Sequence, residues 1–408
     1  LHGWLREQGP WPDLIHSHYA DGGYVGLRLS RLLGVPLVHT GHSLGRDKRQ
    51  RLLAAGMDGE EIDRRYNMLR RIDAEEETLA TADLVITSTH NEIEEQYDLY
   101  DYYQPNLMVV IPPGTDLTQF RPPAAGEPSC DFASEVDRFY DEPTKPLILA
   151  LSRADPRKNI ASLVQAFGES VELQALANLL IVAGNRDDIR DLDEGASGVL
   201  TELLLLVDAY DLYGRVAIPK HHSAEQVPEI YRMVSASQGI FMNPALTEPF
   251  GLTLLEAAAS GLPLVATENG GPVDIIGNCH NGLLVDPLDT NAIADALRQI
   301  LSDAKIWRRF SEQGLAGVRK YYSWTAHAEA YLEQVQPLLE HPAPIPDTRP
   351  LRRSLNYRDR ALFTDLDQSL LGDPQGVEQF AQTMRTNRRC TNFGIVTGRR
   401  LDAALAVL

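Results

Sequence analysis

Short runs of apolar residues recur along the chain, and longer amphipathic stretches separate them. Four such runs come first, at residues 13–19, 35–40, 82–89 and 107–114. Six more follow at residues 147–152, 179–184, 215–219, 239–244, 262–267 and 282–286. Runs rich in Leu, Ile and Val that alternate with helical segments are typical of buried strands in parallel sheets. The pattern therefore predicts two α/β sheets, the second with the regular spacing of a doubly wound fold, followed by a mostly helical region over 291–340.

Two proline-rich segments divide this pattern. Residues 121–146 contain five prolines, and residues 341–350 read HPAPIPDTRP. Proline interrupts helices and sheets, so such segments favour connections between domains. We therefore predict an N-terminal domain over 1–120, a linker over 121–146, a second domain over 147–340, a second linker over 341–359 and the start of a further α/β domain over 360–408. The first residue is not Met and the last lies in an apolar run, so we expect both ends to be truncated.

Composition narrows the classes of partner. The net charge is 38 − 57 = −19, which disfavours binding to nucleic acid or to an anionic membrane. No apolar run approaches the roughly 20 residues that a membrane helix needs. The three cysteines are far apart and lack metal-ligand spacing, which indicates a cytoplasmic protein. Any phosphate-bearing substrate must be held by local basic residues and backbone dipoles, and the oligomeric state is not indicated.

The segment TEPFGLTLLEAAASGLPLVAT, at residues 247–267, carries the clearest chemistry. Pro249 and Gly251 end the preceding strand, so a helix can begin near Gly251. Free N–H groups and the positive dipole end of that helix suit a pyrophosphate. Glu256 falls in the second turn, where its carboxylate can bind both hydroxyls of a ribose, and Glu248 precedes the turn. The alternative is a strand, turn and helix with two solvated glutamates.

This segment resembles the E-x7-E motif of retaining glycosyltransferases with the GT-B fold, two Rossmann-like domains with the donor site in the crevice between them. The resemblance implies that Glu248 contacts the donor sugar and Glu256 the ribose. The residues that it implies for donor binding are Arg153, Lys158, Glu248, Phe250, Gly251, Leu252 and Glu256. The following ENGGPVDII also matches the family, which places a Gly-Gly turn near the donor, although Gly270-Gly271-Pro272 is equally well an ordinary turn.

A second cluster of candidate residues follows the first strand of the second domain, in LSRADPRKNI. Arg153 and Lys158 lie on either side of a turn that contains proline, and two cations at this spacing can bracket a pyrophosphate leaving group. In the resembled family an Arg and a Lys do this in place of a metal ion, so no metal is expected in the transferase. Arg157 is expected to face solvent.

VPLVHTGHSLGRDK, at residues 35–48, places His42 in a glycine-flanked loop directly after a predicted strand. A neutral imidazole there can hydrogen-bond the donor sugar, and the resemblance makes His42 the expected active-site histidine. His39 is the alternative and is expected in the core. His16 and His18 either border the acceptor crevice or pack within their strand. Lys220-His221-His222 is assigned to the rim of the donor site.

Arg70 and Arg71 begin a predicted helix in the first domain. Paired arginines can hold an acceptor phosphate through bidentate contacts, and Lys48 is a weaker candidate for the same phosphate. The resembled enzymes use arginines of this region for fructose 6-phosphate. An Arg71–Glu75 pair at spacing i, i+4 would also stabilise an exposed helix, so both readings stay open.

FTDLDQSLLGD and GIVTGRR, near the end of the chain, resemble the first two motifs of haloacid-dehalogenase (HAD) phosphatases. The resemblance implies that Asp365 is the nucleophile, that Asp367 is the general acid and base, and that Thr397 binds phosphate. Mg²⁺ would bind at Asp365 and Asp367 in a complete domain. The later motifs are missing from this chain, so no phosphatase activity is expected of it.

Together the segments resemble sucrose-phosphate synthases, in which a phosphatase-like domain follows the transferase. The resemblance implies retaining transfer of glucose from UDP-glucose to fructose 6-phosphate. Three alternatives stay open: a mannosylfructose-phosphate synthase that uses GDP-mannose, a transferase like sucrose synthase, and a non-catalytic module that binds a sugar nucleotide.

Overall fold

The computed structural model describes residues 11–124, 126–127, 130–340, 360–365, 374–387 and 391–397. Its contacts divide the chain into two compact units. The first unit comprises Leu1–Ala82, Tyr97–Gln104 and Ala343–Leu408, and the second comprises Asp83–Gln96 and Pro105–Pro342. The domain boundaries expected from the proline-rich segments stay a prediction.

Every strand predicted from the apolar runs of the first 120 residues is present. They form a parallel sheet in the order β1-β2-β3-β4, with bounds Ile15–His18, Leu37–Thr40, Leu84–Thr87 and Met108–Val110. The accompanying helices are α2 (Tyr19–Leu33), α3 (Gly45–Ala54), α4 (Gly59–Tyr66) and α5 (Met68–Leu79). Strands β2 and β3 are buried along their whole length, as their continuous apolar sequence requires.

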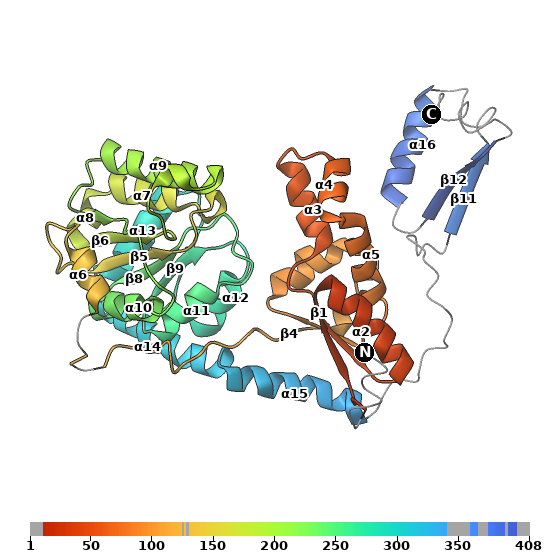
Figure 1. The fold of residues 1–408 in the computed structure, drawn as a ribbon, viewed down its shortest axis with the longest axis horizontal. Helices are drawn as coiled ribbons and strands as arrows, with labels where there is room; N and C mark the ends of the chain where they lie inside the picture. Colours follow the sequence, from red (N-terminus) through yellow and green to blue (C-terminus); the bar gives the residue numbers. More distant parts are fainter. Residues whose placement is uncertain are drawn as a thin grey trace. The chain divides into compact units, whose positions relative to one another are not determined.

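The second sheet has six parallel strands in the order β10-β9-β8-β5-β6-β7 (Figure 1). Their bounds are Leu147–Leu151 (β5), Asn178–Val182 (β6), Val216–Ala217 (β7), Ile240–Asn243 (β8), Leu264–Thr267 (β9) and Gly282–Val285 (β10). Counted from β5 as the first strand, this is the order 3-2-1-4-5-6 of the dinucleotide-binding fold. The six apolar runs thus predict both the strands and their doubly wound class.

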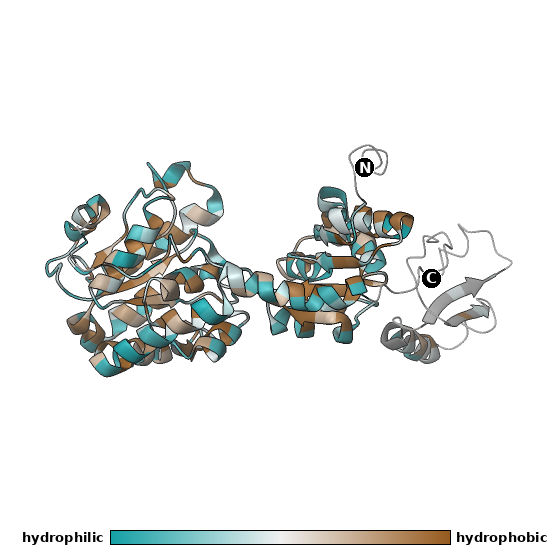
Figure 2. Cartoon of the chain, turned by 90° about the horizontal axis from the view of Figure 1, so that it is seen from below, coloured by the Kyte–Doolittle hydropathy of each residue, from teal (hydrophilic) through white to brown (hydrophobic). Residues whose placement is uncertain are grey.

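Helices cover both faces of this sheet. One face carries α7 (Ile160–Glu169), α8 (Val171–Leu176), α9 (Glu194–Ala209) and α13 (Thr290–Leu301). The other face carries α6 (Asp131–Asp137), α10 (Val227–Ala236), α11 (Leu252–Ala259) and α12 (Pro272–Cys279). Figure 2 shows hydrophobic residues gathered along the strands and polar residues on the outer helix surfaces. The interior of the unit is therefore two apolar layers, one on each side of the sheet.

The segment predicted as the first linker contains a helix of the second unit's core. Phe132 and Val136 of α6 are buried with residues of α10 and β5. Two long helices, α14 (Ala304–Tyr321) and α15 (Trp324–Glu340), complete the helical region predicted for residues 291–340. None of the described helices combines the length and the apolar character that a membrane crossing needs.

The last part of the chain contains a parallel pair of strands, β11 (Arg360–Asp365) and β12 (Thr391–Val396), with the helix α16 (Pro374–Asn387) between them in sequence. This is the α/β start expected for residues 360–408. The predicted linker over 341–359 lies outside the described residues.

Candidate active site

The central strands β5 and β8 are neighbours, yet the chain leaves them in opposite directions across the sheet. After β5 it continues to β6 on one side, and after β8 it continues to β9 on the other. Ligands of doubly wound sheets bind outside the carboxyl ends of the strands at such a switch point. The segments that follow β5 and β8 are those that carry Arg153 with Lys158 and Glu248 with Gly251. The strand order therefore places both predicted donor-binding segments at this one point.

A cavity of about 530 Å³ lies at the switch point. Its lining includes Arg153, Lys158, Glu248, Phe250, Gly251 and Leu252. Of the residues predicted to bind the donor, only Glu256 is not part of this lining. Both cations and the first glutamate of the motif thus share one cavity, although 90 residues separate Lys158 from Glu248 in the sequence.

Lys158 and Glu248 form an ion pair inside the cavity. The Nζ of Lys158 lies 2.6 Å from Oε2 of Glu248, and Nδ2 of Asn243 donates to the same oxygen at 3.1 Å. Glu248 is only 9% exposed, so its carboxylate is held by these two donors. Sequence reasoning missed Asn243, whose only signal is its position as the last residue of β8.

The turn that carries Lys158 is anchored by Asn159, which has a left-handed backbone conformation. The amide of Asn159 donates to the carbonyl oxygens of Pro244 at 3.1 Å and Pro287 at 2.8 Å. Arg157, by contrast, is exposed and forms an ion pair with Asp155. Its hydrogen bonds lower the pKa of Asp155 to about 2. Arg157 is therefore exposed to solvent, as expected, while Lys158 lines the cavity.

Helix α11 begins at Leu252, directly after Gly251. The φ of Gly251 is 107°, a value that side chains other than that of glycine rarely adopt. Glu256 lies in the second turn of α11, as predicted, and accepts a hydrogen bond from the hydroxyl of Tyr231 at 3.1 Å. Burial raises the pKa of Glu256, and the Tyr231 bond opposes this rise. Tyr231 is fully buried, and its hydroxyl holds one carboxylate oxygen of Glu256 in place.

The Gly270-Gly271 turn packs against the backbone of the motif itself. The N–H of Glu248 donates to Asn269 at 3.1 Å, and the N–H of Gly271 donates to the carbonyl oxygen of Glu248 at 2.9 Å. A Cβ on Gly271 would overlap the backbone of Phe250. The turn is thus a backbone clamp on residues 248–250, and the glycines are required for its close approach.

One edge of the cavity is formed by His222. The backbone of His222 exchanges two hydrogen bonds, each 2.8 Å long, with the side chain of Asn185. Lys220 and His221 instead contact Asp187. Of the three residues assigned to the rim, only His222 therefore lines the cavity. Sequence reasoning missed Asn185, which lies in a polar loop after β6.

In the first unit, His42 follows β2; it is exposed and has a left-handed backbone conformation (φ 58°). Its Nε2 lies 2.8 Å from Nδ1 of His18. Desolvation, and then the neighbouring His18, lower the pKa of His42, so the imidazole is neutral at pH 7. His39 is buried and hydrogen-bonds Ser17, and burial lowers its pKa to about 3. These positions match the expectation of an accessible His42 and a core His39.

The three candidates for the acceptor phosphate lie in different surroundings. Arg70 is exposed. Arg71 forms an ion pair with the buried Glu75, with 2.9 Å between Nε and Oε1. The Nζ of Lys48 lies 4.6 Å from the centre of the Tyr66 ring, a cation–π contact. The helix-stabilising alternative for Arg71 thus corresponds to a contact that is present.

At the end of the chain, Asp365 closes β11 and Thr397 follows β12 directly. Because Asp365 pairs with Val396, the two predicted motifs lie at the same edge of adjacent parallel strands. Asp367 lies outside the described residues. Over the described part of the chain, no three His, Cys, Asp or Glu residues are grouped as a metal site would require.

The chain is similar to known proteins over most of its length. Residues 134–316 match the family model "Glycosyl transferases group 1", residues 1–119 match "Glycosyltransferase Family 4", and residues 358–408 match "Sucrose-6F-phosphate phosphohydrolase". The probable sucrose-phosphate synthase 1 of Oryza sativa subsp. indica is 49% identical over 360 residues, which cover 79% of this chain and 33% of that protein. Over most of its own length the chain is therefore similar to the sucrose-phosphate synthases. It spans about a third of the length of the curated relatives that it matches.

Solved structures assign the GT-B fold. A sucrose-phosphate synthase from Thermosynechococcus elongatus matches with a TM-score of 0.60 and 28% identity, over 83% of this chain and 76% of that chain. HepE from Anabaena, solved in complex with UDP, matches with a TM-score of 0.61 and 18% identity, over 80% and 79%. The chain therefore has the fold expected from its E-x7-E motif, with a phosphatase-like segment after it.

Proposed function

We propose that this protein transfers glucose, with retention of configuration, from UDP-glucose to fructose 6-phosphate. The observation that carries the proposal is the cavity between the ends of β5 and β8. Two cations, the Glu248 carboxylate and the start of helix α11 all meet there. Similarity to sucrose-phosphate synthases supports the choice of donor and acceptor, and the HepE complex supports UDP as the nucleotide.

Each side chain then has a distinct role. Arg153 and Lys158, with the first N–H groups of α11, stabilise the pyrophosphate as the bond from the anomeric carbon to the phosphate oxygen breaks. Glu256 accepts the ribose hydroxyls, and Glu248 binds hydroxyls of the glucose. The acceptor hydroxyl forms the new bond on the same face, and its proton passes to the departing phosphate oxygen. No step in this scheme calls for a metal ion.

The acceptor side is drawn from the first unit. His42, neutral at pH 7, hydrogen-bonds the transferred sugar, and Arg70 binds the phosphate of fructose 6-phosphate with help from Lys48. For the C-terminal segment, Asp365 and Asp367 would bind Mg²⁺, and Thr397 the phosphate, in a domain that also supplies the later motifs. We propose a cytoplasmic location because the three cysteines are odd in number and far apart in the sequence.

The test is a donor comparison with the full-length protein. UDP-glucose and fructose 6-phosphate should give sucrose 6-phosphate and UDP, identified by mass spectrometry and by the α configuration of the glucose. Glu248→Gln should lower kcat by about 10²- to 10³-fold while UDP still binds. Turnover with GDP-mannose alone would replace the proposed donor. If UDP binds but no donor is consumed, the protein is a binding module and not an enzyme.

A further inference from the structure

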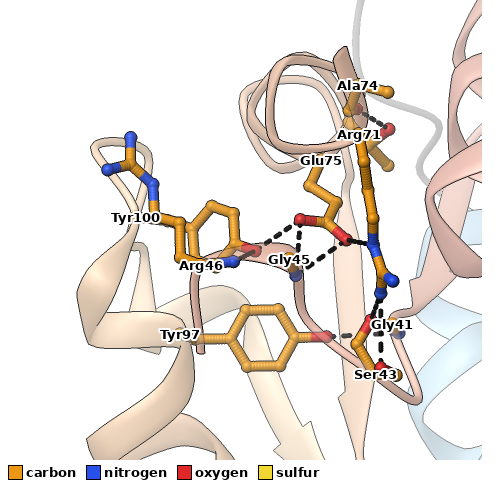
Figure 3. A network of polar contacts seen from close by, with 10 residues as sticks. Gly41, Ser43, Gly45, Arg46, Arg71, Ala74, Glu75, Tyr97 and Tyr100 are labelled. Carbon is orange, nitrogen blue, oxygen red and sulfur yellow. Dashed lines mark hydrogen bonds and ion pairs between the residues drawn. The ribbon is translucent and has the colours of Figure 1, made fainter. Parts of the chain in front are cut away.

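A buried carboxylate lies beneath the loop that carries His42. Glu75, on α5, is 2% exposed and accepts four hydrogen bonds from three donor groups (Figure 3). The N–H of Gly45 donates to both carboxylate oxygens, at 2.9 and 3.1 Å. The hydroxyl of Tyr100 donates at 2.5 Å and Nε of Arg71 at 2.9 Å. A carboxyl group this deeply buried needs such hydrogen-bond partners, so the loss of one member should weaken the whole network.

The loop is held at its centre and at both ends, by this network at Ser43 and Gly45 and by Tyr97 at Gly41. Arg71 continues from Glu75 to Ser43, where Nη2 donates to the carbonyl oxygen and, at 3.3 Å, to the hydroxyl. The N–H of Gly41 donates to the hydroxyl of Tyr97 at 3.2 Å. A Cβ on Gly41 would lie 2.6 Å from that hydroxyl, and a Cβ on Gly45 would lie 2.7 Å from Glu75. Both glycines therefore sit against the side chains that hold them.

Between these fixed points His42 adopts φ 58°, a left-handed conformation that is unfavourable for a residue with a Cβ. Such a conformation persists only where the surroundings over-determine it, and here the neighbours on either side are pinned. The His42 imidazole makes no contact with Glu75 and is hydrogen-bonded instead to His18. The network thus acts on the backbone of His42 and leaves its side chain exposed.

We propose that Glu75 and Arg71 are positioning residues that set the place of His42 for the transfer reaction, an inference that rests on the proposed role of His42. It also assigns different tasks to two adjacent arginines. Arg71 is committed to Glu75 and to Ser43, whereas Arg70 is exposed and is left to bind the acceptor phosphate.

A structural role alone would have a different outcome. If Glu75 only stabilised the fold, its loss would lower the melting temperature without acting through His42. A double-mutant cycle separates the two, because residues that act as one unit are not additive. Glu77→Gln is the matched control: Glu77 lies on the same helix but pairs with Arg28 and not with the loop.

The experiment measures the full-length protein and the variants Glu75→Gln, Tyr100→Phe, Arg71→Lys, Arg70→Lys and Glu77→Gln, each alone and with His42→Ala. Glu75→Gln should lower kcat about 10- to 100-fold, since a displaced catalytic group loses that much. The Kd for UDP should be unchanged, and in the His42→Ala background the same substitution should have little further effect. Tyr100→Phe leaves Glu75 in place and removes only the hydroxyl that donates to Glu75 and accepts from the N–H of Arg46, so it provides a milder variant if Glu75→Gln unfolds.

Equal losses in both backgrounds would overturn the proposal. So would a rise in the KM for fructose 6-phosphate in Arg71→Lys as large as that in Arg70→Lys. A second readout is independent of turnover: the rate at which diethyl pyrocarbonate modifies His42, followed by peptide mass spectrometry. Glu75→Gln should change that rate and Glu77→Gln should not. If the wild type transfers no sugar, the proposed function fails. The positioning role is refuted separately, if Glu75→Gln leaves the rate of His42 modification by diethyl pyrocarbonate unchanged.

Discussion

Two loops that each follow a parallel strand are held in different ways. The loop of residues 244–251, after β8, is held partly by backbone: the N–H of Glu248 donates to the carbonyl oxygen of Asn269, and its carbonyl oxygen accepts from the N–H of Gly271. The loop of residues 41–45, after β2, is held by the side chains of Glu75, Arg71 and Tyr97. The first device is encoded by small residues near the motif, and the second by residues 28 to 56 positions away.

The comparison explains which parts of the site were visible in the sequence. A backbone clamp needs glycine where two chains approach closely, so it leaves a recognisable local string. A side-chain clamp needs only a partner of the right chemistry at the right place, and the fold decides which distant residue that is. The following experiments test whether the donor loop depends on backbone fit and local charge, in contrast to the His42 loop.

The largest effect is expected at the cations. Lys158→Ala should lower kcat about 10²- to 10³-fold, because it removes a charge that stabilises the leaving pyrophosphate. Arg157→Ala is the matched control, since Arg157 is exposed and paired with Asp155, and its kcat should stay near that of the wild type. Steady-state kinetics with UDP-glucose measure both. Equal losses would mean that the turn acts through its total charge and not through geometry.

The next effect tests the backbone clamp. Gly271→Ala should lower the free energy of unfolding by about 1–3 kcal/mol and weaken UDP binding, because the added methyl would overlap Phe250. Gly277→Ala lies within α12, the helix that follows Gly271; its added methyl meets nothing within 4 Å, so it should be neutral or stabilise by about 0.5–1 kcal/mol. Urea denaturation and calorimetric titration with UDP measure the two quantities. If Gly271→Ala binds UDP as tightly as the wild type, UDP binding does not depend on the close backbone packing of this turn.

Beneath the His42 loop, His39 should make stability depend on pH. Burial, and then the nearby His16, His18 and His42, lower its pKa to about 3 in the folded state. Below about pH 6.5, His39 therefore binds a proton in the unfolded chain but not in the folded chain. As the pH falls, the free energy of unfolding should decrease by about 1.4 kcal/mol per pH unit. His39→Gln should remove this contribution. Denaturation curves at about pH 7 and about pH 5.5 check the difference, and an unchanged slope would refute it.

The smallest effect is expected at Tyr231, which supports Glu256 by a single hydrogen bond. Tyr231→Phe should weaken UDP binding by about 0.5–1.5 kcal/mol, which is at most about tenfold in Kd. Tyr210→Phe removes a comparable bond to Glu169 on α7 and should leave UDP binding unchanged. Calorimetric titration measures the Kd for UDP of both variants. Equal values would show that Glu256 does not depend on its hydrogen bond from Tyr231.

Periodicity and motif were sufficient for much of the architecture. All ten apolar runs are strands, because a run of branched apolar residues between polar turns is stable chiefly in a buried sheet. The predicted start of α11 after Gly251 and the place of Glu256 in its second turn are present as well. These features depend on neighbours within a few residues, which is why the sequence displays them.

Other features could not be read in this way. Helix α6 could not be predicted from its proline-rich segment, because Phe132 and Val136 are buried against strands that lie far along the chain. Arg71 belongs to a buried network because Glu75 and Tyr100 come together beneath the loop. Asn243 has no meaning as a site residue until Lys158 and Glu248 are brought beside it. In each case at least one of the deciding contacts comes from a segment far along the chain, which a local pattern does not indicate.

The sequence by itself determined the α/β class, the strands, the donor motif with its two cations, and the similarity to sucrose-phosphate synthases. These are consequences of local propensity, hydrophobic period and short strings of residues. Only the tertiary structure decided that β5 and β8 lie side by side, that Lys158 pairs with Glu248, and that Glu75 lies under the His42 loop. The physical reason is that strand order and buried charge pairing depend on contacts between distant segments, which exist only once the chain has folded.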